Sequence, residues 1–169
     1  RDVYRGEKTF ANDLVDESKR ADLLVIGGGN YLELWPENTS TGTSLDLSDE
    51  IIDAIHCPIF FNALGVDAGQ GIGSSAKQNF THFINKLIGS DRFLVTVRND
   101  GSFQTVCSVL GNAEKIVEIP DHGFFGKLEV SDSCPYANDE TIVGVNIAVD
   151  MPNLRFSEFD NTEAFLTEF

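Results

Sequence analysis

Cysteine is scarce in this sequence, and its few copies are scattered. Cys57, Cys107 and Cys134 are odd in number and lie in three different segments. Such spacing excludes a disulfide framework and does not match the paired pattern of a zinc site. We therefore expect no metal site, and the reducing cytoplasm as the location.

Long apolar runs are also missing. No stretch of the sequence approaches the roughly 20 apolar residues that a membrane helix needs. Residues 1–20 are charged throughout and lack the apolar centre of a signal peptide. Of the 169 residues, 41% are hydrophobic and 23% are charged, which is typical of a globular domain with one core. The sequence therefore predicts a single ordinary domain without a membrane span.

Positive charge is the third shortage. Lysine and arginine number 12 against 27 aspartates and glutamates, a formal net charge of -15. A field of this sign repels the phosphate backbone, so we expect no nucleic-acid partner. An anionic small substrate would need a local cation, which draws attention to each arginine or lysine near a glycine-rich turn.

What the sequence does contain is a regular alternation of apolar strands and amphipathic helices. This pattern predicts an α/β fold, a Rossmann-like, doubly wound and mostly parallel sheet. Residues 33–43 and 65–73 are predicted loops. The predicted strands are 22–26, 59–64, 93–97, 116–119 and 141–149, and the predicted helices are 7–19, 48–56, 80–88, 103–110 and one from about residue 161.

The predicted strand over 22–26 runs into Gly27, Gly28 and Gly29, whose backbone can adopt positive φ and approach a ligand closely. Their spacing is not the Gly-x-Gly-x-x-Gly of a dinucleotide site, and a tight turn without a ligand remains an alternative. In a parallel sheet, ligands bind beyond the carboxyl ends of the strands. We therefore expect the segments that follow the strands, 27–30, 65–73, 98–102 and 121–124, to share one edge.

Arg98 is the only cation in those four segments, and its planar fork suits a carboxylate or phosphate. The alternative is an ion pair between Arg98 and Asp100 or another acid. Asp121 and His122 follow the fourth strand, although Asp121 is equally explained by the turn after Pro120. The candidate binding residues are Gly27, Gly28, Gly29, Asn30, Arg98, Ser102, Asp121 and His122.

Four pieces of the sequence together resemble the polysaccharide pyruvyl transferase family. They are residues 21–29, 58–65, 97–102 (Val-Arg-Asn-Asp-Gly-Ser) and 119–121 (Ile-Pro-Asp), in that order and at those intervals. The resemblance covers roughly residues 20–149. It implies a two-lobed GT-B-like architecture and transfer of the enolpyruvyl unit of phosphoenolpyruvate onto a sugar hydroxyl pair. The product is a pyruvate ketal in exopolysaccharide biosynthesis.

The resemblance also sets expectations for the parts of the molecule. Phosphoenolpyruvate is the donor substrate, a carbohydrate is the acceptor, no further cofactor is implied, and Arg98 is the cation for the donor. The family's arginine-leucine-histidine piece and its first strand-loop are missing from this sequence, so the catalytic acid and base are unknown. We therefore expect residues 1–140 to be a first-lobe domain incomplete at its N-terminus, and residues 141–169 to be the first strand and helix of a second lobe. The 169 residues alone are expected to be inactive.

One alternative belongs to a different class of protein. The same fold, without the donor chemistry, would serve as a non-catalytic sugar- or nucleotide-binding domain.

Overall fold

The computed structural model describes residues 11–127, together with Thr141 and Val143. The chain divides into two units, residues 1–127 and 128–169. Several predictions thus fall outside the described residues, apart from Thr141 and Val143. They are the start of the predicted helix (residues 7–10), the domain boundary after residue 140, the strand over 141–149 and the helix from residue 161. The elements are α1 (Asn12–Ser18), β1 (Leu24–Gly27), β2 (Asn30–Glu33), α2 (Asp49–Ala54), β3 (Ile59–Asp67), α3 (Ser74–Ile88), β4 (Phe93–Arg98), α4 (Ser102–Leu110), β5 (Val117–Ile119) and the 3-10 helix η1 (His122–Phe125).

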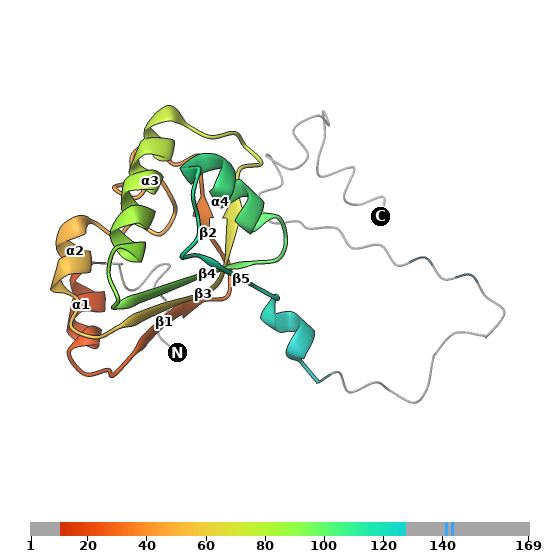
Figure 1. The fold of residues 1–169 in the computed structure, drawn as a ribbon. Helices are drawn as coiled ribbons and strands as arrows, with labels where there is room; N and C mark the ends of the chain where they lie inside the picture. The colour runs from red at the N-terminus through yellow and green to blue at the C-terminus, as the bar shows by residue number, and fades with distance from the viewer. Residues whose placement is uncertain (1–10, 128–140, 142, 144–169) are drawn as a thin grey trace, which may run out of the picture. The chain divides into compact units, whose positions relative to one another are not determined.

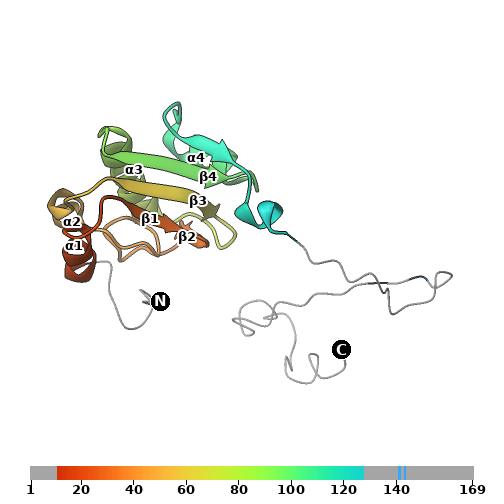
Figure 2. The same cartoon turned by 90° about the horizontal axis from the view of Figure 1, so that it is seen from below.

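The strands form a parallel sheet in the order β1-β3-β4-β5, with β2 also paired to β3. Every pairing among these strands is parallel. Figure 1 shows α3 and α4 on the same side of the sheet, and Figure 2 shows the strands from below. The predicted α/β class with a parallel sheet is therefore confirmed.

The two faces of the sheet differ in what covers them. After β1, strands β3, β4 and β5 are added in one direction, and right-handed crossovers then place their helices on one face. On the other face, Val25, Leu94 and Val117 are about half exposed, at 56%, 50% and 47%. A doubly wound sheet has helices on both faces, and α3 and α4 cover the same face. The doubly wound arrangement therefore stays a prediction.

The helices α3 and α4 follow the predicted periodicity. Helix α3 ends at Gly89, and α4 ends at Gly111, whose φ of 78° suits a residue without a side chain. Helix α2 begins after Ser48, whose hydroxyl accepts a hydrogen bond from the Ile51 amide at 3.4 Å. The stripe that α3 buries against the sheet consists of the predicted Phe80, Phe83, Ile84 and Leu87, together with Ala76.

The segment after the glycines differs from the prediction. The chain resumes as strand β2, which pairs with β3 beyond β1: Gly27 is opposite Asn62, and Asn30 is opposite Gly65. The β2–β3 register then shifts, so that Leu32 is opposite Val66. Strands β1 and β2 are therefore two parts of one path along β3, interrupted at residues 28–29. The interruption after the strand is therefore shorter than the predicted loop, because pairing with β3 resumes at Asn30; ligand contact by this turn stays a prediction.

Strand β3 is also longer than predicted, and it includes Gly65, the first residue of the predicted loop 65–73. The segment from residue 34 to 47 is a loop, which contains the predicted loop 33–43 except for Glu33 of β2, and it is well packed. The side chains of Thr41 and Thr43 are buried, and the Thr41 hydroxyl donates to the Leu45 carbonyl at 2.8 Å. This loop packs against the start of α3, where Gly42 lies beside Ala76.

Candidate functional site

The candidate site lies where β1 and β3 depart from regular strand geometry at the same level. Gly28 has a φ of 89° and Ala63 a φ of 50°, left-handed values that are uncommon for a residue with a side chain. The pairing of β3 with β4 shifts register between Phe61 and Leu64. Beyond this level, β2 and the end of β3 turn toward the helices (Figure 1). The sheet is therefore interrupted at the carboxyl ends of β1 and β4.

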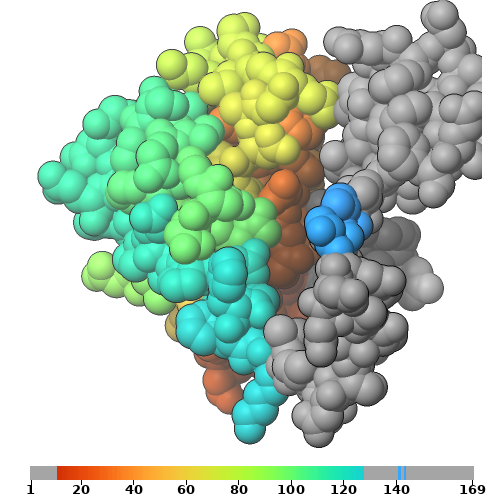
Figure 3. All heavy atoms as spheres, turned by 90° about the vertical axis from the view of Figure 1, so that its right-hand side faces the viewer, coloured from red at the N-terminus to blue at the C-terminus, as the bar shows by residue number. Residues whose placement is uncertain are grey.

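A small pocket of about 110 Å³ is present at this interruption. In Figure 3 the orange atoms of β1 and β2 lie beside the green and cyan atoms of later elements. The structure thus brings together residues from three of the four predicted segments, 27–30, 98–102 and 121–124, whereas the segment 65–73 contributes no residue to the described lining. The lining comprises the predicted Gly28, Arg98, Asp121 and His122, and also Asn62 and Ala63, which the prediction missed.

Arg98, at the end of β4, is the best-connected side chain of the site. Its Nη2 atom lies 3.0 Å from Asp100 Oδ2 and also contacts Asn30 Oδ1, and its Nη1 atom lies 3.3 Å from Asp121 Oδ2. The Arg98 side chain is 19% exposed, against 44% for each aspartate. Of the two hypotheses for Arg98, the ion pair is what the structure shows, and binding of an external anion stays a prediction.

Asp100 is held from its other side by Ser102. The Ser102 hydroxyl and amide donate to Asp100 Oδ1 at 2.5 Å and 3.2 Å, and the Ser102 hydroxyl accepts from the Val66 amide at 2.8 Å. Burial acts to raise the pKa of Asp100, but the Ser102 hydrogen bonds and the charge of Arg98 outweigh it and hold that pKa below its usual value. The stabilisation from this carboxylate is therefore present above its unfolded pKa and is lost as the pH falls through the lower folded value.

Gly65 makes room for the Arg98 guanidinium. A Cβ atom at this position would overlap both Asn30 Oδ1 and Arg98 Nη2. Gly65 is opposite Asn30 in the β2–β3 pairing. Because Gly65 has no side chain, the Asn30 side chain and the Arg98 guanidinium can meet at this position. A glycine inside an apolar strand is the sequence signal for such a close approach.

Asp121 and His122 are positioned by the short helix η1. Asp121 Oδ1 accepts from the Gly123 amide at 2.8 Å, and the Asp121 amide donates to Asn99 Oδ1 at 3.3 Å. The Asp121 carboxylate therefore both caps η1 and pairs with Arg98. His122 Nδ1 lies 3.3 Å from Asn62 Nδ2, which joins η1 to β3.

The pocket contains polar atoms whose hydrogen-bonding capacity is unused. Arg98 Nε and Asn62 Oδ1 are buried and have no partner within the described part of the chain. Most buried polar atoms in proteins are hydrogen-bonded, so an unpaired donor and acceptor at one pocket are consistent with a site that a ligand or water completes.

The other predicted binding residues lie around the pocket in different ways. Gly27 packs closely against β3, where a Cβ would lie 2.7 Å from the Asn62 carbonyl oxygen, and the Gly29 carbonyl accepts from the Gly65 amide at 3.1 Å. Ser102 is 1% exposed and its hydroxyl is engaged by Asp100 and Val66. The structure thus gives Gly27, Gly29 and Ser102 supporting positions, and direct ligand contact by them stays a prediction.

Asn62 is the functional candidate that sequence reasoning missed. It is a polar residue inside the apolar run from residue 59 to 64, and a buried strand position that keeps an amide calls for a hydrogen-bond partner. That signal was present in the sequence. Its partner, His122, lies 60 residues away and could not be identified from the sequence.

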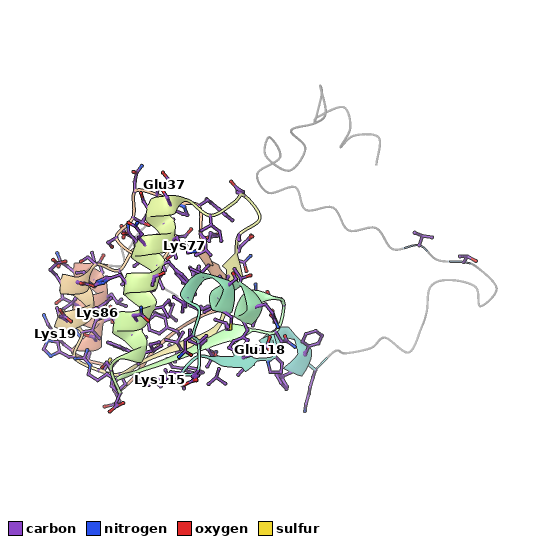
Figure 4. The ribbon with its side chains drawn as sticks, turned by 45° about the horizontal axis from the view of Figure 1, so that its top comes forward. Lys19, Glu37, Lys77, Lys86, Lys115 and Glu118 are labelled. Carbon is purple, nitrogen blue, oxygen red and sulfur yellow. The ribbon has the colours of Figure 1, made fainter. Side chains whose placement is uncertain are left out.

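No lysine within the described residues lines the pocket. Figure 4 labels Lys19, Lys77, Lys86 and Lys115. Lys86 Nζ lies 2.8 Å from Asp53 Oδ1, and Lys115 Nζ donates to the Ile88 carbonyl at 2.9 Å. Both contacts lie at the end of α3 that is opposite to the pocket. Among the described residues, Arg98 is the only lysine or arginine in the lining.

Among residues 11–127, 141 and 143, no helix is long and apolar enough to cross a membrane. Among the same residues, no group of three or more histidine, cysteine, aspartate or glutamate side chains is arranged to hold a metal ion. Comparison of the chain with models of known protein families, with curated proteins and with solved structures finds no match.

Proposed function

We propose that this chain is a Rossmann-like domain of a pyruvyl transferase-like enzyme with a GT-B-like architecture, which acts on a sugar in the cytoplasm. In this proposal the pocket at Arg98 binds an acidic end of phosphoenolpyruvate. The observation that carries the proposal is the meeting of Gly28, Arg98, Asp121 and His122 at one pocket beyond the strand ends. The sequence resemblance to the family supplies the choice of donor.

The size of the pocket limits what it would hold. Sites for whole small molecules usually measure about 300–1,000 Å³, whereas this pocket measures about 110 Å³. It therefore suits one carboxylate or phosphate group of the donor. The unpaired Nε of Arg98 is a ready donor for such an oxygen.

Binding of the donor requires Arg98 to exchange a partner. The contact with Asp121 is the longer of its two ion pairs, at 3.3 Å against 3.0 Å. Asp100 is in addition fixed by two hydrogen bonds from Ser102. We therefore propose that a donor carboxylate or phosphate takes the place of Asp121 on Nη1, while Asp100 keeps the guanidinium in position.

The substitution Arg98→Lys tests this proposal. Lysine keeps the charge but loses the planar fork, so the affinity for phosphoenolpyruvate should fall by about 1.5 to 3 kcal/mol, the value of a charge-assisted hydrogen bond. Titration calorimetry of the chain with phosphoenolpyruvate at fixed ionic strength measures the change. Because Arg98 pairs with two half-exposed aspartates, we also expect a loss of unfolding free energy of about 1 kcal/mol or less.

Arg92→Lys is the matched control. Arg92 precedes the same strand at its other end, where it donates to the Ile55 carbonyl at 2.8 Å, far from the pocket lining. Its replacement should leave the affinity unchanged. Equal losses for Arg92→Lys and Arg98→Lys would mean that the lost affinity does not come from the Arg98 guanidinium in the pocket, and the proposed donor site would be rejected.

A non-catalytic sugar-binding domain is the second candidate. It is favoured by the two carboxylates that already neutralise Arg98, because an added anion meets their repulsion while neutral hydroxyl groups do not. The same calorimetry with neutral monosaccharides separates the candidates. Binding of a sugar, with no binding of phosphoenolpyruvate, would select this alternative.

A further inference from the structure

The β-bulge at Asn62 and Ala63 is a strained feature that the surrounding structure holds in place. Ala63 has a φ of 50°, and within the described part of the chain it is the only non-glycine residue with a positive φ. Its amide donates to the Thr96 hydroxyl at 2.9 Å, and that hydroxyl donates to the Phe61 carbonyl at 2.9 Å. Thr96 is 3% exposed. Such strain persists only where the surroundings enforce it, and it is concentrated at functional sites.

The bulge determines where the Asn62 side chain lies. A bulge changes the direction of a side chain relative to a regular strand, and here the register of β3 against β4 shifts immediately after Phe61. On the neighbouring strand, Asn62 is opposite Gly27, which has no side chain. The amide of Asn62 is thus available at the pocket and meets His122 at 3.3 Å.

The Asn62 contact assigns a tautomer to His122. With the Asn62 amide oriented as in the structure, Nδ2 donates to His122 Nδ1, which is then the unprotonated nitrogen. The proton of the neutral ring is then on Nε2. The structure shows no partner for Nε2 within the described residues.

We propose that Asn62 is a positioning residue for His122, and that His122 Nε2–H donates a hydrogen bond to an acidic oxygen of the bound ligand. The ligand class is a carboxylate or phosphate, recognised together with Arg98. The inference rests on the proposed function for the identity of the donor, phosphoenolpyruvate. It adds a second binding group and the residue that orients it.

Amide side chains allow a test that separates the two ring nitrogens. A glutamine at position 122 places an N–H donor near the position of Nε2 and lacks an equivalent of Nδ1, whereas phenylalanine keeps the ring shape and removes both nitrogens. We therefore expect His122→Gln to stay within about threefold of the original affinity and His122→Phe to lose about tenfold, the loss of one hydrogen bond to a charged group. His82→Gln is the control, since His82 is 64% exposed and pairs with Asp49 away from the pocket.

The experiment is a double-mutant cycle on affinity, measured by calorimetry with phosphoenolpyruvate and with inorganic phosphate as probes. Asn62→Leu should weaken binding about three- to tenfold when residue 122 is histidine, and should have no effect when residue 122 is glutamine. A thermal melt of each variant, close to that of the original chain, shows that the fold is kept. A positioning role requires that the effect of Asn62→Leu depend on a histidine at position 122. A general structural effect of Asn62→Leu would weaken binding equally in both backgrounds.

The outcomes separate this inference from the proposed function. If phosphate binds with the expected pattern and phosphoenolpyruvate does not bind, the inference stands and the proposed donor is wrong. If phosphoenolpyruvate binds and His122→Phe leaves its affinity unchanged, or Asn62→Leu weakens it equally in both backgrounds, the inference is overturned and the proposed donor stands. If neither anion binds the original chain, both are overturned.

Discussion

Replacement of Gly42 by alanine is expected to lower the free energy of unfolding by about 3 kcal/mol or more, because two separate costs add at this position. Gly42 has a φ of 67°, where an L-residue is strained. A Cβ there would also overlap the Ala76 carbonyl oxygen and lie 2.8 Å from the Ala76 Cα. The overlap is with the helical backbone at the buried Ala76, which cannot move aside as a flexible side chain would.

Gly71→Ala is the matched control for the first of these costs. Gly71 has a φ of 91°, and nothing lies within 4 Å of its Cβ position. Its replacement should cost only the backbone strain, about 1 to 2 kcal/mol. Denaturant unfolding of both variants measures the difference, and equal losses would show that the loop over residues 34–47 is not packed on α3 as described.

Removal of the Phe61 ring is expected to cost about 3 to 5 kcal/mol, the usual range for a fully buried phenylalanine. Phe61 is 1% exposed in β3, and its ring meets Phe83 of α3 edge-to-face, with centroids 6.3 Å apart. Phe61→Ala therefore leaves a cavity between the sheet and α3. It removes no hydrogen bond of the pocket, because only the Phe61 backbone carbonyl contacts Thr96.

Phe61→Leu is the control that keeps most of the volume. It should cost about 1.5 kcal/mol or less, and both variants should unfold in a single transition with a similar denaturant dependence. A loss below about 1 kcal/mol for Phe61→Ala would contradict the packing of α3 on this face of the sheet.

The regular parts of the fold could be predicted from the sequence because their signals are local. The apolar positions of α3 repeat at i, i+3, i+4 and i+7 from Phe80, and glycines follow α3 and α4 at their ends. Three of the predicted strands, 22–26, 59–64 and 93–97, are apolar except for one residue each, a composition that parallel sheets favour. The alternation of these elements was then enough to predict a parallel sheet.

The interruption that forms the pocket could not be predicted in the same way. Strand β2 contains only Tyr31 and Leu32 as large apolar residues, and it is a strand because β3 continues far enough to pair with it. The positive φ of Ala63 depends on Thr96, 33 residues away. A local pattern does not carry this information, since the conformation is set by tertiary hydrogen bonds.

The site itself was predicted in part. The rule that ligands bind beyond the strand ends brought Gly28, Arg98, Asp121 and His122 together, as the pocket lining shows. The partners of Arg98 could be predicted less well: Asp100 is two residues away in the sequence, whereas Asn30 lies in β2 and Asp121 immediately precedes η1. In a chain with many acidic residues, the aspartate that pairs with Arg98 is determined by distances in the folded structure, which the sequence does not give.

Phosphoenolpyruvate can be mapped on the chain most directly by amide chemical-shift changes in a titration. The proposed donor site predicts changes that saturate and that are concentrated at the residues that line the pocket, Gly28, Asn62, Ala63, Arg98, Asp121 and His122. Changes concentrated elsewhere, for example along Ser74, Lys77 and Thr81 at the second surface hollow over α3, or no saturable change at all, would contradict it.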